Sequence, residues 1–423
     1  MRRLLAVVFT AALVGAAPVQ AQDLIPEPDL QRHLAALGQI AAENGGNRAA
    51  GTPGESRTGD YAADRLAEAG WTITRTDVPF DYWAEGEPST VGRYRHGRDF
   101  VTLHYSGAGD VTARVRPIYG NGCNPREFRR FRRGQIAIVA AASCTFRRSA
   151  LVAQRAGASA VLIADFTAGA PTAGTMVRPG VDVPVVGIRL PIARRLARSR
   201  PRIRVRVAPI AEKRVTQNVI AELPGSDPQR VVMAGGHMDS TPRGAGINDN
   251  GSGVAALIEM GRRLAAQPRG AATVRLAFWA AHENGIYGSL RYVRGLPTEE
   301  RRRIQAYLNI DMVGSLNGVP EIYGTRRRIR SAIRRHLRGA GRTSSDSGSD
   351  HTAFMRAGIP VGGIYTGSLE PKTQRQRKRW GGRAGVERDR CYHQPCDDVD
   401  NINLRMLSLS ATAAAKALAD LGR

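Results

Sequence analysis

The feature that most constrains the fold is a repeated pattern in the second half of the chain, where apolar segments end in an acid or a histidine. The three segments and the side chains that follow them are residues 231–234 with His237, residues 274–280 with His282 and Glu283, and residues 306–310 with Asp311. Helical patterns alternate with them, at residues 253–264, 299–305, 327–337 and 404–420. Such alternation is typical of a largely parallel sheet covered on both faces, with a site beyond the carboxyl ends of its strands. The sequence therefore predicts an α/β fold with a site at one edge of the sheet.

The first half of the chain has a different pattern of apolar and turn-forming residues. Two helical patterns precede an edge-strand pattern, at residues 28–42, 60–69 and 70–78. Short β segments broken by glycine and proline then follow as far as about residue 207, without a residue cluster that suggests chemistry. We therefore expect a three-layer sandwich with a mostly parallel central sheet, made of residues 22–100 and 208–423. A separate β-rich domain is expected as an insertion at residues 101–207.

Residues 1–21 have the form of a signal peptide. Arg2 and Arg3 precede an apolar stretch that ends at Val14, and small residues lead to Ala21, after which we expect cleavage. The stretch is shorter than the roughly 18 apolar residues that mark a membrane span, and no other segment reaches that length. We therefore expect a secreted or periplasmic protein without a transmembrane anchor.

The four cysteines of the chain all lie well after this segment. An even number of cysteines outside the cytoplasm favours two disulfides. Proximity along the chain pairs Cys123 with Cys144 and Cys391 with Cys396. A zinc finger is disfavoured, because no C-x-x-C pair occurs.

The chain is strongly basic, with 62 lysine and arginine residues against 37 acidic residues and a net charge of +25. Such a field attracts acidic polymers. The basic residues are scattered, however, and aromatic residues make up only 6% of the chain, so there is no platform for stacking bases. We therefore expect no nucleic-acid partner, and only a loose attraction to an anionic cell envelope.

Two further segments add candidate ligands. Asp249 lies in a polar, glycine-rich loop at the start of a helix, which is either a simple capped turn or the source of a bridging carboxylate. His393 lies inside the short segment between Cys391 and Cys396, which is either a stapled surface turn or a rigid support for the histidine. Asp239 follows His237 closely and could orient its ring by accepting the second N–H.

Taken together, the candidates form a set of two histidines and three carboxylates: His237, Asp249, Glu283, Asp311 and His393. Imidazole and carboxylate suit zinc, and two ions that share a carboxylate can activate a water and polarise a carbonyl. The reaction class that this set predicts is metal-assisted hydrolysis.

The motifs that carry these residues resemble those of a known family. GGHMDS, GINDNGSG, FWAAHENGIYGS, NIDMVGS and RCYHQPCD occur in this order and closely resemble the secreted two-zinc aminopeptidases of the phosphorylase/hydrolase-like fold. GNGCNPREF, the segment from GQIAIVAAASC to AVLIAD, and VDVPVVGI resemble a protease-associated domain, which many members carry at this point.

The resemblance implies a role for each residue. One zinc ion would lie on His237 and Asp311 and the other on Glu283 and His393, with Asp249 and a water bridging them. Tyr392 would stabilise the tetrahedral intermediate through its phenolic O–H. Asp350 and Met312 are the candidate substrate contacts, although Asp350 could instead cap the helix that follows it. The implied substrates are the N-termini of peptides or proteins, often with a large apolar first residue, and a structural calcium ion is an additional candidate.

The sequence departs from the family at two positions. His282 stands where the family has a glutamate that acts as general base, and Gly348 stands where some relatives have an arginine that contacts substrate. Histidine can accept a proton with an ordinary pKa near 6.5, and two nearby cations favour its neutral form. Its reach differs from that of glutamate, and proton transfer depends on hydrogen-bond geometry.

Three hypotheses follow from these observations. The first is an exported zinc aminopeptidase in which His282 is the base. The second is a zinc-bearing binding protein whose peptidase activity is impaired by His282. The third is a zinc carboxypeptidase on the same scaffold.

Overall fold

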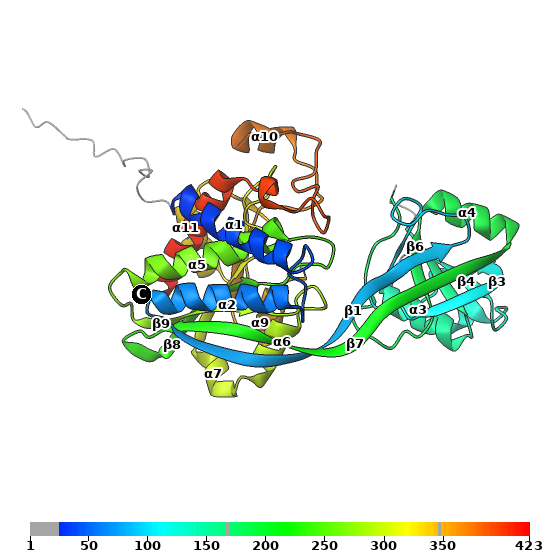
Figure 1. Cartoon of the computed structure of the whole chain (residues 1–423), viewed down its shortest axis with the longest axis horizontal. Coiled ribbons are helices and arrows are strands. Elements are labelled where there is room, and N and C mark those ends of the chain that lie inside the picture. The colour runs from blue at the N-terminus through cyan, green and yellow to red at the C-terminus, as the bar shows by residue number, and fades with distance from the viewer. Residues whose placement is uncertain (1–24, 142, 166–169, 346–347) are drawn as a thin grey trace, which may run out of the picture.

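The computed structural model describes residues 25–141, 143–165, 170–345 and 348–423, so the expected signal peptide, residues 1–21, lies outside the described residues. Figure 1 shows a larger and a smaller lobe joined by two long strands, β1 (Thr72–Val91) and β7 (Arg202–Leu223). These strands pair antiparallel from Thr72 opposite Glu222 to Val91 opposite Val205. The edge-strand pattern at residues 70–78 is thus the first part of a strand that continues into the smaller lobe.

The larger lobe is built on a mostly parallel sheet in the order β12-β11-β13-β10-β8-β9-β7. Its remaining strands are β8 (Asp227–His237), β9 (Ala272–Trp279), β10 (Ile304–Ile310), β11 (Glu321–Gly324), β12 (Gly341–Arg342) and β13 (Val361–Tyr365). β8 pairs parallel with both β9 and β10, and β10 pairs parallel with β13. The predicted α/β fold with a mostly parallel central sheet is confirmed.

Side chains of the central strands alternate between two apolar layers. On β8, Val232 and Ala234 pack with one layer of helices, whereas Val231 and Met233 face the other. The first layer contains α1 (Glu27–Glu43), α2 (Pro53–Glu68), α5 (Ser252–Ala265), α8 (Arg327–His336) and α11 (Leu404–Gly422). The second contains α6 (Tyr287–Gly295) and α9 (His351–Arg356). The shorter helices α7 (Thr298–Arg303) and α10 (Gln374–Trp380) and the turns η3 (Ile247–Gly251) and η4 (Val399–Asn401) complete this lobe. The result is the expected three-layer sandwich.

The start of α2 differs from the expectation of a helix over residues 60–69. The helix begins at Pro53, because proline fits the first helical position, where its missing N–H costs nothing. Gly54 lies so close to the preceding link that a Cβ atom there would come within 2.4 Å of the carbonyl oxygen of Asn47. Pro53 and Gly54, which are also typical turn residues, therefore form the beginning of the helix.

The smaller lobe has its own apolar cores and a mainly parallel set of strands. Its elements are β2 (Phe100–Thr102), β3 (Gly109–Pro117), η2 (Pro125–Phe128), β4 (Ile136–Ala140), α3 (Phe146–Arg155), β5 (Ala160–Ala164), β6 (Val185–Ile188) and α4 (Leu190–Ser199). The disulfide Cys123–Cys144 lies in this lobe. The limits 101–207 stay a prediction, since β1 and β7 pass between the lobes without a break.

The smaller lobe contacts the larger one beside the end of β9. The hydroxyl of Tyr105 donates to the carbonyl oxygen of Asn284, and Nδ2 of Asn284 donates to the carbonyl oxygen of Trp83 at 3.2 Å. The segment that follows β9 is therefore held from both lobes. Within the described residues, no helix combines the length and apolar character that crossing a membrane requires.

Candidate metal centre

The five side chains predicted as metal ligands lie together at the carboxyl edge of the parallel strands. His237 is the last residue of β8, Glu283 follows β9 and Asp311 follows β10, and these three strands are neighbours in the sheet. Asp249 comes from η3, before α5, and His393 comes from the loop between Cys391 and Cys396. Five separate segments thus supply one cluster, as expected for the edge of a parallel sheet.

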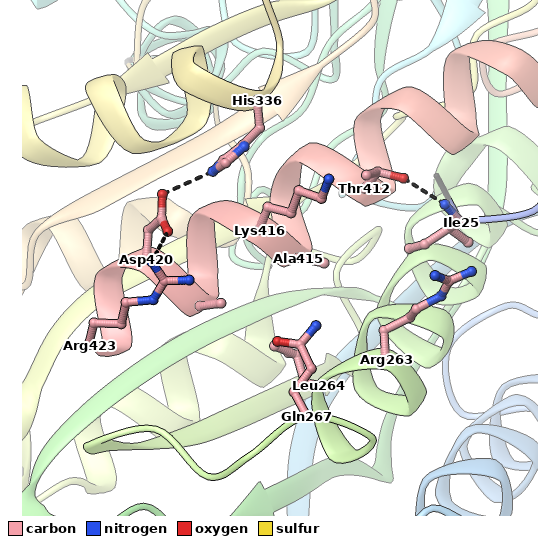
Figure 2. Close-up of a pocket in the computed structure, with 11 residues that line it drawn as sticks. Ile25, Arg263, Leu264, Gln267, His336, Thr412, Ala415, Lys416, Asp420 and Arg423 are labelled. Atoms are coloured by element: carbon pink, nitrogen blue, oxygen red, sulfur yellow. Dashed lines mark hydrogen bonds and ion pairs between the residues drawn. The ribbon is translucent and has the colours of Figure 1, made fainter. Parts of the chain in front are cut away.

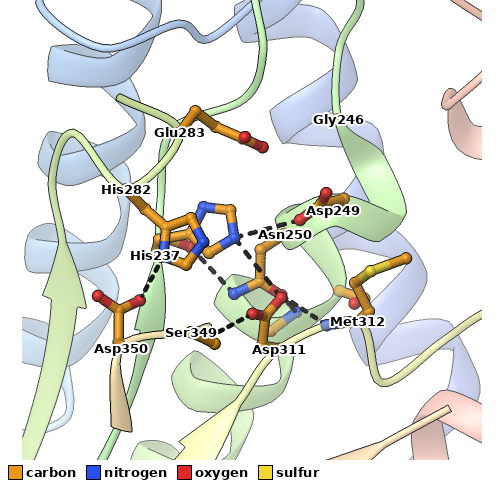
Figure 3. A network of polar contacts seen from close by, with 12 residues as sticks. His237, Gly246, Asp249, Asn250, His282, Glu283, Asp311, Met312, Ser349 and Asp350 are labelled. Atoms are coloured by element: carbon orange, nitrogen blue, oxygen red, sulfur yellow. Dashed lines mark hydrogen bonds and ion pairs between the residues drawn. The ribbon is translucent and has the colours of Figure 1, made fainter. Parts of the chain in front are cut away.

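Asp249 lies between the two histidines. Its Oδ1 is 3.1 Å from Nε2 of His237, and its Oδ2 is 3.0 Å from Nε2 of His393. On the first side, Oδ1 of Asp311 is 3.5 Å from Nε2 of His237 (Figure 3). On the second side, Oε2 of Glu283 is 3.2 Å from Nε2 of His393. Each half of the cluster therefore has one histidine and one carboxylate, and Asp249 is shared.

The donor atoms of this cluster fit zinc. Nε2 of His237, Oε1 of Glu283 and Oδ1 of Asp311 are buried and have no hydrogen-bond partner among the residues that the structure describes, although buried polar atoms are normally paired. Two zinc ligands with bonds of about 2.0–2.1 Å at a tetrahedral angle lie about 3.3 Å apart. The separations of 3.0–3.5 Å in the cluster match that value.

Neighbouring groups of the cluster shift one another's pKa values. Burial by itself raises the pKa of Asp249, but its close contacts with His237 and His393 outweigh burial and hold the pKa below its ordinary value. Burial lowers the pKa of His393, yet Glu283 and Asp249 raise it well above the ordinary value. The shared carboxylate Asp249 is therefore kept ionised, which is the state that binds cations.

Asp239 supports the cluster in two ways. Nδ1 of His237 is 3.0 Å from the backbone carbonyl oxygen of Asp239 and 3.5 Å from its Oδ1, so the expected orienting contact is made mainly by the backbone. The carboxylate accepts the backbone N–H groups of His282 and Glu283, each at 3.0 Å. Asp239 therefore also fixes the segment that carries the ligand Glu283.

Asp397 is a supporting residue that the sequence reasoning missed. Its Oδ1 accepts the backbone N–H of Asn248 at 2.8 Å and its Oδ2 accepts that of Asp249 at 3.0 Å. Burial raises the pKa of Asp397 to about 7. Because Asp397 directly follows Cys396, it ties the disulfide loop to the loop of the shared carboxylate. Its place beside the loop was the available signal, but sequence does not reveal contacts with backbone amides.

Breaking the Cys391–Cys396 disulfide is expected to weaken zinc retention. His393 has a φ of 57°, in the left-handed region that costs free energy for a residue with a side chain, and the closed loop holds it there. In the variant with serine at both positions, we expect roughly tenfold or greater loss of zinc affinity, measured by competition with a chelator.

The matched control replaces Cys123 and Cys144 with serine, because that disulfide lies in the smaller lobe. Equal zinc affinity in the two double variants would contradict the role assigned to the loop at His393.

A cavity of about 210 Å³ opens at the cluster. Besides ligands and His282, its lining consists of polar and aromatic residues, one methionine and one glycine: Asn309, Met312, Tyr323, Thr343, Gly348, Ser349, Tyr365, Ser368 and Tyr392. The ring of Tyr392 stacks on that of His393 with centroids 3.8 Å apart. Met312 and Gly348 border the cavity, as expected of residues near a substrate.

The position of Asp350 favours a role other than the expected substrate contact. Its side chain is fully buried and is not part of the cavity lining, and it makes no capping hydrogen bond at α9. Its Oδ2 lies 2.8 Å from Nδ1 of His282. Next to it, Ser349 donates from Oγ to Oδ2 of Asp311 at 2.6 Å, a ligand support that the sequence reasoning did not assign.

His282 lies at the centre of these contacts. Its ring stacks on that of His237 with centroids 3.8 Å apart and an angle of 11° between the planes. Burial and the charge of His237 lower the pKa of His282, but Asp350 and Asp311 raise it, and the balance lies at about 9. A pair of cations at the cluster would act in the opposite direction.

The structure also has a pocket of about 320 Å³ between α5, α8 and α11 (Figure 2). The ion pair between His336 and Asp420 borders it, with Nε2 and Oδ2 2.9 Å apart. The two groups of described residues arranged like metal ligands both belong to the cluster at His237. The calcium expectation therefore stays a prediction.

A mostly parallel sheet with two histidines and three carboxylates at its carboxyl edge defines a metallohydrolase. Residues 218–418 match peptidase family M28, and residues 109–196 match the PA domain. An aminopeptidase of Pseudomonas aeruginosa is 35% identical, over 95% of this chain and 82% of the relative. The chain belongs to peptidase family M28.

Other relatives agree with this assignment. The probable lipoprotein aminopeptidase LpqL of Mycobacterium tuberculosis is 31% identical, over 92% of this chain and 83% of the relative. Leucine aminopeptidase 2 of Trichophyton rubrum is 30% identical, over 89% of this chain and 80% of the relative. The family resemblance seen in the motifs is thus confirmed.

Solved structures share the fold. An aminopeptidase from Aneurinibacillus sp. strain AM-1 superposes with a TM-score of 0.80 at 24% identity and covers 94% of each chain. BSAP, a zinc aminopeptidase from Bacillus subtilis, superposes with a TM-score of 0.71 at 22% identity and covers 93% of this chain and 94% of that one. Both structures extend over the two lobes.

Proposed function

We propose that the protein is an exported zinc aminopeptidase that removes N-terminal residues from peptides. The observation that carries the proposal is the position of Asp249, whose two oxygens each face one histidine of the cluster. A carboxylate shared in this way suits two zinc ions, with His237 and Asp311 on one and Glu283 and His393 on the other. When bound, such ions polarise the scissile carbonyl and make a water nucleophilic at neutral pH.

The residues of this chain supply the remaining chemistry. His282 lines the cavity and is the candidate to accept a proton from the attacking water and return it to the leaving amine nitrogen. The phenolic O–H of Tyr392, stacked beside His393, can donate to the oxygen of the carbonyl as negative charge develops on it. Met312, Tyr323 and Tyr365 give the cavity an apolar and aromatic part, which suits a large apolar first residue.

The cavity lining disfavours the carboxypeptidase hypothesis. A carboxypeptidase binds the negative C-terminal carboxylate of its substrate, for which arginine is the suited partner. Although the chain has 62 lysine and arginine residues, none is among the described residues that line this cavity. The described lining therefore offers no guanidinium or ammonium group to a C-terminal carboxylate.

The purified mature protein is expected to hold two zinc ions per chain and to release leucine from leucyl-anilides and from peptides with a free N-terminus. The same peptides with an acetylated N-terminus should not be cleaved, because they lack the positive amine. Metal analysis and a peptide panel test both points. Absence of bound zinc would refute the proposal, and cleavage from the C-terminus would favour the carboxypeptidase.

The second candidate, a zinc-bearing binding protein, rests on His282, which stands where the family has a glutamate. It predicts two bound zinc ions without turnover of any free-amine peptide. Good activity of the unmodified protein would exclude it.

A further inference from the structure

His282 is placed between the metal cluster and a buried acid. It directly precedes the ligand Glu283, its ring is packed flat against that of the ligand His237, and it lines the cavity. On the side away from the ligands, Nδ1 is 2.8 Å from Oδ2 of Asp350 (Figure 3). The ring is therefore held by stacking on one face and by a hydrogen bond at one nitrogen.

Asp350 is committed to this contact. Its side chain is fully buried, and its Oδ1 has no hydrogen-bond partner among the residues that the structure describes. A buried carboxylate is costly unless it has a partner, and its one hydrogen bond to a side chain here is the one to His282. Asp350 is separated from His282 by 68 positions in the sequence, so local chain geometry does not produce the contact.

We infer that Asp350 is a positioning residue that fixes both the tautomer and the direction of the His282 ring. A carboxylate that accepts the hydrogen bond at this contact places the hydrogen of the neutral His282 ring on Nδ1. Nε2 of that neutral ring carries the lone pair, on a side chain that borders the cavity. The pair thus gives histidine a defined proton acceptor where a glutamate would supply a carboxylate. This inference rests on the proposed function.

An alternative use of the free Nε2 is as an additional metal ligand. Ligand atoms of His237, His282 and Asp311 lie within 4.8 Å of one another, so the distances alone permit it. The two uses differ in what the ring nitrogen carries in the zinc-loaded protein. A proton acceptor keeps a free lone pair, whereas a ligand has its Nε2 bonded to zinc.

The spectroscopic test uses zinc-loaded protein with 15N-labelled histidine. The signals of His282 are assigned by their loss in H282Q. We expect Nδ1 to be protonated and Nε2 to be unprotonated and free of metal in the parent, and this pattern to be lost in D350N. A ring with protonated Nε2, or with zinc on Nε2, would overturn the inference. Because this measurement needs no turnover, its result does not depend on whether the protein has peptidase activity.

The kinetic test compares D350N with a matched pair elsewhere. D350N is expected to lower kcat about a hundredfold, with KM and zinc content unchanged. The control is D420N, because Asp420 also pairs with a histidine, His336, but lies away from the cluster. This variant should keep kcat within about twofold of the parent value. Loss of zinc in D350N, or kcat within about threefold of the parent, would overturn the inference.

A double-mutant cycle separates positioning from general damage. If Asp350 acts only through His282, D350N should change kcat by less than about twofold in an H282Q background. A full additional loss in that background would overturn the inference. A second comparison uses H282E. This substitution alone places a second carboxylate against that of Asp350, and the two negative charges repel each other. Adding D350N removes that repulsion. We expect the double variant to be several times more active than H282E.

Discussion

Replacement of Asp249 by alanine is expected to remove both zinc ions and to lower activity by on the order of a thousandfold or more, because metal assistance is lost. Each carboxylate oxygen of Asp249 faces a different histidine. Oδ1 is 3.1 Å from Nε2 of His237, and Oδ2 is 3.0 Å from Nε2 of His393. Among the described residues, Asp311 contacts only His237 of these two histidines and Glu283 contacts only His393, so neither carboxylate is shared. One substitution therefore removes a ligand from both ions.

Zinc content by elemental analysis and kcat with a leucyl-anilide measure the effect. The control is Asp64→Ala, because Asp64 is exposed on α2, away from the cluster. Circular dichroism checks that both variants are folded. Retention of two zinc ions in the Asp249 variant would disprove the shared-ligand arrangement.

The His282→Gln variant is expected to keep both zinc ions and to lose about 10²–10⁴-fold in kcat, the usual contribution of a positioned acid or base. Glutamine is similar in size and polar, so the stacking partner His237 stays covered, but it cannot accept and release a proton. Steady-state kinetics combined with metal analysis distinguish this effect from loss of zinc.

Two results would contradict a catalytic role for His282. One is an unchanged kcat in an active parent protein, which would show that the proton is accepted elsewhere. The other is loss of zinc in the variant, which would indicate that the ring holds metal instead. An inactive parent with zinc bound would favour the binding-protein hypothesis.

The sequence predicted the fold and the cluster of candidate ligands because both follow from short patterns. His237, Glu283 and Asp311 stand at the ends of apolar segments, and parallel strands bring such ends to one edge. His393 and Asp249 lie on loops, where periodicity gives no information, and they were found through the cysteine pair and the polar, glycine-rich loop. Their roles as ligands remain predictions.

The supporting residues could not be predicted because their contacts join distant segments. Asp397 receives backbone N–H groups 148 and 149 positions earlier in the chain, and any acid near any loop could do the same. Asp350 was predicted as a substrate contact or a helix cap, but its buried side chain contacts His282 instead. The start of α2 was missed because Pro53 and Gly54 are equally typical of turns.

The paired strands β1 and β7 also determine how the smaller lobe can be removed or exchanged. Deletion of residues 101–207 would leave β1 intact while removing the first part of β7, so Thr90 and Val91 would lose their partners Arg206 and Val205. An unpaired strand edge invites association between molecules. A cut at one rung, such as Tyr82 opposite Glu212, shortens both strands equally and can be closed by a tight turn. At each such residue pair, the smaller lobe could be replaced by a different domain without a change in the register of the sheet that carries the candidate site.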